Sequence, residues 1–222
     1  APVHPARVLE VLTPAYAPAG LQEKERSERA YFDFFPVLRN IAGYVWDFPT
    51  QVNGQIMRCW GIYDTNLLAE EERPPLKEPL DEEMSRFGFH LQDYEIKGHP
   101  IRWFTPQNPM AVPRVLLVGD AAGADPFLGE GISIALGYGA LAARAIGESF
   151  VKNDFSFNSY KKRVLKSALG KALLTRWFLT YVIYPFKWKG SQILFWRILK
   201  PIAVPFAWKF VLNWGKRMAS IL

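Results

Sequence analysis

Residues 115–132 read Val-Leu-Leu-Val-Gly-Asp-Ala-Ala-Gly-Ala-Asp-Pro-Phe-Leu-Gly-Glu-Gly-Ile, and this stretch decides the fold. The segment 114–118 carries a short continuous apolar run, typical of a strand buried on both faces of a parallel sheet. A glycine-rich turn follows at once. The helix predicted over 129–150 is built largely of small residues, which allow close approach of a backbone or a flat ligand. Strand, turn and helix in this order predict an α/β unit.

The turn also carries groups that suit a cofactor. Gly119 lets the chain turn, and Asp120 offers an acceptor to a ribityl or ribose hydroxyl. Gly129 and Gly131 open the helix, whose free N–H groups suit a pyrophosphate or a ring edge that gains negative charge on reduction. An Asp, a Pro and a Gly-Glu-Gly stand in fixed order before a small-residue helix. This order favours a flavin site over a ligand-free strand-loop-helix junction.

At these residues the sequence resembles the geranylgeranyl reductase group of FAD-dependent oxidoreductases, and the resemblance covers roughly residues 30–150. The larger class also contains aromatic hydroxylases and flavin halogenases. The resemblance implies FAD as the cofactor. Its ribityl and phosphate region would be contacted by Gly119, Asp120, Ala121 and Ala122, and its pyrophosphate and ring by Pro126, Gly129, Glu130, Gly131 and Ile132.

A second motif, Tyr44-Val-Trp-Asp-Phe-Pro49, places aromatic residues at alternate positions. On a strand these form one apolar wall, and the proline ends the pairing. The motif is similar to an element that lines the isoprenoid cavity of geranylgeranyl reductases, so the resemblance implies that Tyr44, Trp46, Phe48 and Pro49 bind substrate. The alternative is an ordinary aromatic core strand. Where the family has a Gly-x-Gly, this chain has Gly61-Ile62-Tyr63, which predicts a narrower or altered cavity.

The remaining elements are predicted from local patterns. Residues 1–20 suggest a strand or connector, 21–30 a short helix, 31–48 and 55–63 antiparallel strands joined by a turn at 50–54, 80–91 a helix capped by Asp81, and 94–104 a strand. The fold class is therefore α/β (α+β). We divide the chain into an antiparallel substrate-binding sheet (1–110), the C-terminal part of a Rossmann-like FAD-binding domain (111–153) and a helical tail (154–222).

The family's N-terminal Gly-x-Gly-x-x-Gly, which holds the ADP part of FAD, has no counterpart in this sequence. The chain alone is expected to bind FAD weakly or not at all. The chain also begins at Ala1 without an initiator Met, which suggests truncation or processing. We expect a missing N-terminal segment, or a separate chain, to complete the FAD site.

The tail is strongly basic. Residues 155–222 contain 13 Lys and Arg and no Asp or Glu, whereas residues 1–154 carry 14 basic against 21 acidic residues. Five tryptophans are interleaved with these cations, and the longest uncharged run, 177–186, is too short to span a bilayer. Aromatic residues with Lys and Arg favour helices lying in a membrane interface over a protein partner's hydrophobic surface. Nucleic acid is the least favoured partner because the tail is too apolar.

The sequence therefore predicts a peripheral membrane protein at the cytoplasmic face, an FAD-dependent reductase of double bonds in a polyprenyl lipid. The alternatives are a flavin monooxygenase or halogenase acting on a hydrophobic substrate, and a non-catalytic half-flavoprotein subunit docked in a membrane complex. No catalytic acid stands out; Tyr44, Tyr63 and Glu130 are candidates, and Glu130 equally suits a helix-start role. The single Cys59 is expected to be a buried strand residue. The three histidines have no metal-ligand spacing, and we expect no metal.

Overall fold

The computed structural model describes residues 5–16, 28–67, 73–206, 208–209 and 213–219. The chain forms two compact units: residues 1–100 with 185–192, and residues 101–184 with 193–222. The helix predicted over 21–30 lies almost wholly outside the described residues.

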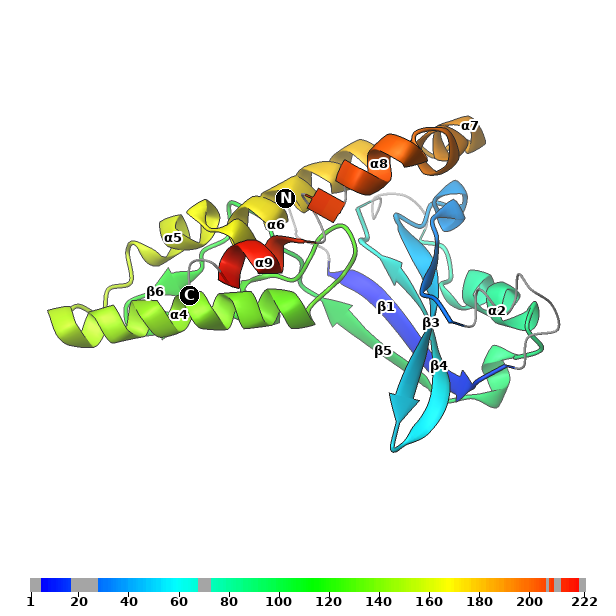
Figure 1. Cartoon of the computed structure of the whole chain (residues 1–222), viewed down its shortest axis with the longest axis horizontal. Helices are drawn as coiled ribbons and strands as arrows, with labels where there is room; N and C mark the ends of the chain where they lie inside the picture. The colour runs from blue at the N-terminus through cyan, green and yellow to red at the C-terminus, as the bar shows by residue number, and fades with distance from the viewer. Residues whose placement is uncertain (1–4, 17–27, 68–72, 207, 210–212, 220–222) are drawn as a thin grey trace. The chain divides into compact units, whose positions relative to one another are not determined.

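The first unit is built on a five-stranded sheet of order β2-β3-β4-β1-β5 (Figure 1). The pairs β2–β3, β3–β4 and β4–β1 are antiparallel. Asn53 and Gly54 turn the β3–β4 hairpin, and both have positive φ (50° and 82°), as a tight hairpin turn requires. This confirms the predicted antiparallel sheet. The strands are β1 (Ala6–Pro14), β2 (Tyr31–Asp33), β3 (Gly43–Val52), β4 (Gln55–Asp64) and β5 (Ile96–Ile101).

One face of this sheet packs under the helix α2 (Lys77–Ser85). The apolar core there contains Val45, Trp60 and Ile62 from the strands, with Leu80 and Met84 from the helix. Because side chains alternate along a strand, the neighbours of these strand residues point to the opposite face of the sheet.

Three local predictions in this unit are wrong. Pro49 does not end the pairing of its strand, because β3 continues to Val52 and Pro49 is itself in register with Arg58. The strand predicted over 31–48 is interrupted by the 3-10 helix η1 (Phe35–Arg39), which has a proline at its start and ends at Asn40 in the left-handed region (φ 62°). Asp81 lies inside α2 and does not cap it; its Oδ1 instead accepts from the Leu91 amide at 2.6 Å, in the short helix η2 (Leu91–Asp93). In the sequence, an Asp that accepts a hydrogen bond from a later loop cannot be distinguished from an Asp that caps a helix.

Helices dominate the second unit (Figure 1). Its core gathers Tyr138 and Leu141 with Val164, Leu173 and other residues from separate helices. The predicted small-residue helix over 129–150 is present as α4. The helices of this core are α3 (Gly119–Ala122), α4 (Ile132–Lys152), α5 (Tyr160–Lys166), α6 (Ala168–Ile183) and α9 (Trp214–Ala219).

The buried parallel strand predicted over 114–118 is wrong. The structure has only β7 (Val115–Leu116), which pairs antiparallel with β6 (Ala111–Val112). Val115 and Val118 are 49% and 40% exposed. An apolar run indicates burial, but a parallel strand needs neighbours, and within the described part of the chain β7 pairs only with β6.

The tail divides between packed and exposed segments. Its first helices, α5 and α6, bury Tyr160, Val164 and Leu173, and Trp214 of α9 is 4% exposed. By contrast α8 (Lys200–Phe206) has no buried residue. The remaining segments are α7 (Lys189–Ile193) and the π-helical turn η3 (Leu194–Ile198). Within the described residues, none of the helices has the length and apolar character needed to cross a bilayer.

Candidate functional site

The candidate cofactor site is formed by the turn α3 and the start of α4, both in the second unit. A Cβ built on Gly131 would lie 3.4 Å from Asp120 Oδ1, and one on Gly119 would lie 3.5 Å from the Ala135 side chain. The structure thus places the Gly-Asp and Gly-Glu-Gly parts of the motif close together. Asp120, Ala121 and Ile132 are exposed, so a ligand can reach this corner.

The loop between α3 and α4 closes on itself. The Asp125 amide donates to the Glu130 carbonyl (3.1 Å), and the Gly129 amide donates to the Asp125 carbonyl (3.1 Å). Asp125 Oδ1 also accepts from the Phe127 amide at 2.8 Å. Gly129 has φ 69°, a conformation that L side chains rarely adopt. The loop geometry therefore depends on residues of the predicted motif.

The base of this loop lies against the chain that precedes it. Residues 103 and 124 form an isolated parallel bridge, and the Phe104 amide donates to the Ala124 carbonyl at 2.8 Å. Gly123, at φ 120°, leaves no room for a side chain, because a Cβ would lie 2.5 Å from Phe104 Cα. Pro126 and Ala122 are buried in the same region.

Glu130 has a structural role at the start of α4. Its Oε1 accepts from the Ser133 amide at 3.0 Å, and its Oε2 lies 3.5 Å from Arg176 Nη1. A carboxylate at this end of a helix pairs with an unsatisfied N–H group and with the helix dipole. Of the two roles open to Glu130, helix start or proton donor, this geometry supports the first.

A buried ion pair beside the loop was not predicted from the sequence. Arg176 Nη1 of α6 lies 3.4 Å from Asp125 Oδ2, and the two side chains are 1% and 0% exposed. Burial raises the pKa of the Asp125 carboxyl, and the Arg176 charge partly offsets that rise. The available signal was an arginine inside the otherwise apolar stretch 172–183, since a buried charge needs a partner.

The aromatic motif of β3 lies on the sheet face opposite the α2 core. The rings of Tyr44 and Trp46 are 5.9 Å apart, and both residues are less than 10% exposed. Trp46 is paired in register with Gly61, whose missing side chain makes room for the indole. Phe48 is half-buried and Pro49 is exposed. The predicted alternation of aromatic residues is therefore present as a wall formed chiefly by Tyr44 and Trp46.

Tyr63 stands on the same face, opposite Tyr44 in the β3–β4 register. Its ring lies 5.9 Å from that of Tyr44, and the residue is 1% exposed. The tyrosine thus fills volume that a glycine would leave open beside the wall. This arrangement agrees with the narrower space expected from the Gly61-Ile62-Tyr63 sequence.

The motif's central Asp47 points the other way and was not singled out from sequence. Arg58 of β4 binds it, with Nε–Oδ1 at 2.7 Å and Nη2–Oδ1 at 2.6 Å. Both side chains are at most 2% exposed, and the Arg58 guanidinium lies 4.9 Å from the centre of the Tyr16 ring. Next to this pair, Cys59 is buried as expected.

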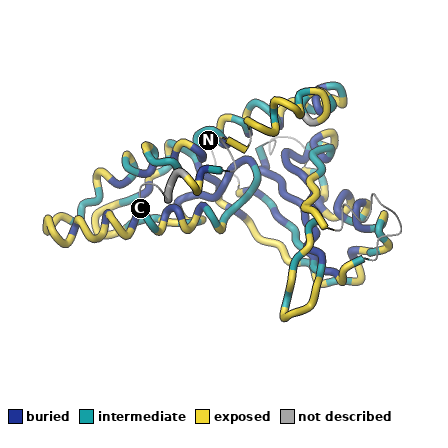
Figure 2. Tube along the Cα trace, viewed as in Figure 1, coloured by how far each residue is buried: buried dark blue, intermediate teal, exposed yellow. Residues whose placement is uncertain are grey.

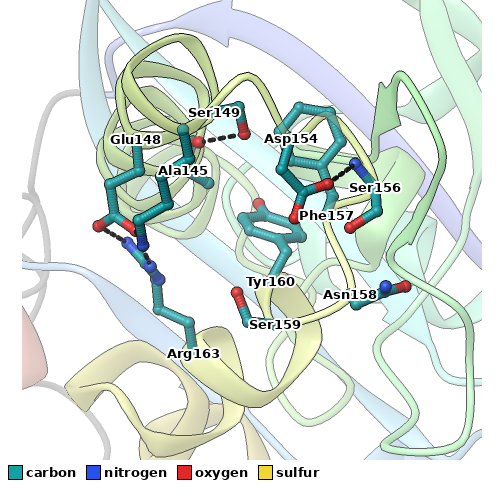
Figure 3. Close-up of a pocket in the computed structure, with 11 residues that line it drawn as sticks. Ala145, Glu148, Ser149, Asp154, Ser156, Phe157, Asn158, Ser159, Tyr160 and Arg163 are labelled. Carbon is teal, nitrogen blue, oxygen red and sulfur yellow. Dashed lines mark hydrogen bonds and ion pairs between the residues drawn. The ribbon is translucent and has the colours of Figure 1, made fainter.

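A separate pocket lies at the far end of α4 (Figure 3). Its charged groups are already engaged: Arg163 binds Glu148 through two 2.6 Å contacts, and Asp154 Oδ1 accepts from the Ser156 amide at 2.9 Å. This pocket shares no residue with the 119–132 corner. Among the described residues, no cluster of three or more His, Cys, Asp or Glu side chains is arranged to hold a metal ion.

Comparison with known proteins places the fold. A crystal structure of a geranylgeranyl bacteriochlorophyll reductase-like protein from Thermoplasma acidophilum matches 82% of this chain with a TM-score of 0.61 and 22% identity. The chain covers 44% of that protein. An uncharacterized protein of Methanosarcina barkeri is 29% identical over 133 residues, which are 60% of this chain and 32% of the relative. No protein-family model matches. The chain is thus similar in fold to a reductase-like protein and spans less than half of either relative.

Proposed function

We propose that this chain is part of an FAD-dependent reductase that saturates carbon–carbon double bonds of a polyprenyl, geranylgeranyl-type lipid at a membrane surface. The observation that carries the proposal is the proximity of the Asp120 carboxylate to Gly131 at the accessible start of α4. The two halves of the motif singled out from sequence meet there, in a chain whose fold is similar to that of a reductase-like protein.

The residues at this corner fit an FAD molecule. Gly131 leaves the space beside Asp120 open, because a Cβ there would already lie at the edge of van der Waals contact with the carboxylate. Asp120 would accept a hydrogen bond from a ribityl hydroxyl, with Gly119, Ala121 and Ala122 alongside. Gly129, Gly131 and Ile132, with Pro126 and Glu130, would lie near the pyrophosphate and ring. When bound, the flavin supplies two-electron chemistry to the substrate.

The aromatic wall supports an apolar substrate. Tyr44 and Trp46 are buried and give one sheet face flat, largely apolar surfaces, with the half-buried Phe48 and the exposed Pro49 continuing the strand. Such surfaces bind an isoprenoid chain by excluding water from it. Tyr63 restricts the width of the wall, which favours a single extended chain over a bulky ring system.

The exposed side of α4 supports a further stretch of polypeptide as the partner that completes the FAD site. Exposed apolar and small residues recur along this helix at spacings of three, four and seven and form a stripe on its solvent-facing side (Figure 2): Ile132, Leu136, Gly139, Ala143, Ile146 and Phe150. Ile132 and Leu136 are 82% and 72% exposed, and Phe150 is 72% exposed. Val115 of β7 is also exposed. Apolar side chains that stay exposed next to one another mark interaction sites, and both relatives are more than twice as long as the matched region.

The exposed tail segment supports peripheral membrane binding at the cytoplasmic face. Ile198, Ile202, Val204 and Trp208 are each at least 54% exposed, and all the charged residues between 155 and 222 are cations. Apolar and aromatic side chains among Lys and Arg suit the boundary between acyl chains and anionic headgroups. A lipid-borne substrate would reach an enzyme resting on that boundary without passing through water.

The proposal is tested with the full-length protein, reduced anaerobically and mixed with a geranylgeranyl lipid in detergent. A reductase reoxidises its flavin under these conditions, and the product gains one pair of hydrogens for each bond saturated, as measured by mass spectrometry. Flavin reoxidation that requires oxygen, with an oxygenated or halogenated product, would instead identify a monooxygenase or halogenase. A full-length protein without flavin would support a non-catalytic subunit.

A further inference from the structure

We infer that Arg176, from the tail helix α6, is a positioning residue that holds the loop 125–131 in the shape the flavin requires. The inference rests on the proposed function, because it assumes that this loop lies beside the flavin. Its structural basis is a single nitrogen: Arg176 Nη1 lies 3.4 Å from Asp125 Oδ2 and 3.5 Å from Glu130 Oε2. One guanidinium thus joins the two ends of the loop.

The burial of these groups makes the arrangement specific. Arg176 and Asp125 are 1% and 0% exposed, whereas the Glu130 side chain is 38% exposed. A guanidinium and a carboxylate withdrawn from water are costly unless they compensate each other. If either group moved away, the other would be a buried charge without its counter-ion. The pair therefore fixes the distance between α6 and the base of the loop.

A second contact, from the C-terminal end of α6, holds the middle of the loop. The Tyr184 hydroxyl donates to the Phe127 carbonyl at 2.6 Å, and the two rings lie 5.3 Å apart. Tyr184, which ends α6, follows Arg176 by eight residues, so the two contacts lie about two turns apart along the helix. Two tail residues therefore hold the loop: Arg176 contacts its two ends, and Tyr184 contacts its centre.

Glu130 connects Arg176 to the start of α4. One of its oxygens accepts from the Ser133 amide and the other faces Arg176. If Arg176 is removed, Glu130 loses its cation and Asp125 is left as an unpaired buried charge. We expect the loop to shift and the amides of Gly129 and Gly131 to be presented to the flavin in the wrong geometry.

The test compares Arg176→Met, Arg176→Lys and a control, Arg163→Met, in the full-length protein. Arg163 belongs to the same unit but pairs with Glu148 at the far end of α4. FAD affinity is measured by quenching of flavin fluorescence, and the bound flavin is examined by visible circular dichroism. Hydrogen exchange of the 125–133 amides is followed with and without FAD. If Arg176→Met fails to fold, the charge-neutral double variant Asp125→Asn/Arg176→Met replaces it.

Arg176→Met is expected to weaken FAD binding about tenfold, to change the flavin dichroism and to speed exchange in the loop. Arg176→Lys should recover part of the affinity, and Arg163→Met should match the wild type in all three measurements. Wild-type FAD affinity, dichroism and exchange in the Arg176→Met or double variant would overturn the inference. If the wild type binds no FAD, the proposed function fails, and the exchange rates alone decide whether Arg176 holds the loop.

Discussion

The Asp47–Arg58 pair shows how much of the first unit's stability depends on single residues. Its atoms lie 2.6–2.7 Å apart with almost no solvent contact, and Tyr16 covers the guanidinium from one side. A pair of this kind adds little over an apolar pair, but breaking it by removing one member is expensive. The Asp125–Arg176 pair of the second unit follows the same logic.

Replacing Arg58 by Met should therefore lower the free energy of unfolding by about 3–5 kcal/mol, because Asp47 is left buried without its cation. Urea denaturation followed by tryptophan fluorescence measures the change. The matched control is Arg39→Met, which removes an exposed ion pair with Glu82 (2.7 Å) and should cost at most about 1 kcal/mol. Equal losses for the two variants would contradict the importance assigned to the buried pair.

Cys59 gives a prediction about alkaline pH. Burial raises the pKa of the Cys59 thiol from its ordinary 9.0 to about 12. Above pH 9.0 the unfolded chain therefore loses a proton that the folded chain retains, and stability falls as the pH rises from about 9 to about 12. Burial raises the pKa of Tyr160 to about 12 as well, so wild type must be compared with Cys59→Ala. Urea titrations across this range should show a shallower decline in Cys59→Ala; parallel declines would exclude the thiol as a source.

At the scale of elements, the sequence predicts what neighbouring residues determine. The Asn53-Gly54 hairpin, the aromatic alternation of β3 and the helix α4 follow from turn chemistry and periodicity, and the structure confirms all three. The strand at 114–118 fails because burial of an apolar run depends on partners elsewhere. The ion pair between Arg176 of α6 and Asp125 of the loop could not be predicted either, since the two residues are distant in sequence.

The exposed stripe of α4 leads to a paired substitution. Leu136→Glu places a charge within the stripe, and Val151→Glu places the same charge beside it, about 100° around the helix from Phe150. Both residues are well exposed, at 72% and 87%. In the full-length protein, Leu136→Glu should reduce the flavin retained on purification, because a charge opposes docking of an apolar partner surface. Val151→Glu should retain flavin as the wild type does; equal retention in both variants would contradict the docking role.

The exposed helix α8 allows a direct test of membrane binding. Ile202→Glu removes an apolar group that is 72% exposed and adds an acid to a segment without any. In flotation with vesicles containing anionic phospholipid, we expect Ile202→Glu to lower binding of the full-length protein about tenfold. Added salt should weaken the vesicle binding of the wild type. Ile56→Glu, at an equally exposed position in the β4 hairpin, should bind as the wild type does. Unchanged binding by Ile202→Glu would argue against a lipid-facing α8.

At the scale of the whole molecule, the chain supplies two compact units and less than half the length of either relative. The first unit offers an aromatic wall, and the second offers the turn and helix start that we propose as the flavin site. The wall and the turn could be predicted from the sequence because each is a local motif with its own chemistry. The buried polar contacts that hold both motifs in place could not, because they join residues from separate elements.

The central claim is that the 119–132 turn binds FAD, and its most direct test is titration of the full-length apoprotein with FAD for wild type and Asp120→Ala. In the proposed site, loss of the carboxylate would remove a charge-assisted hydrogen bond to the ribityl chain. We predict that the FAD affinity of Asp120→Ala is lower by about tenfold or more, with an unchanged far-ultraviolet dichroism spectrum. Wild-type affinity in Asp120→Ala would place the flavin elsewhere and contradict the assignment of this site.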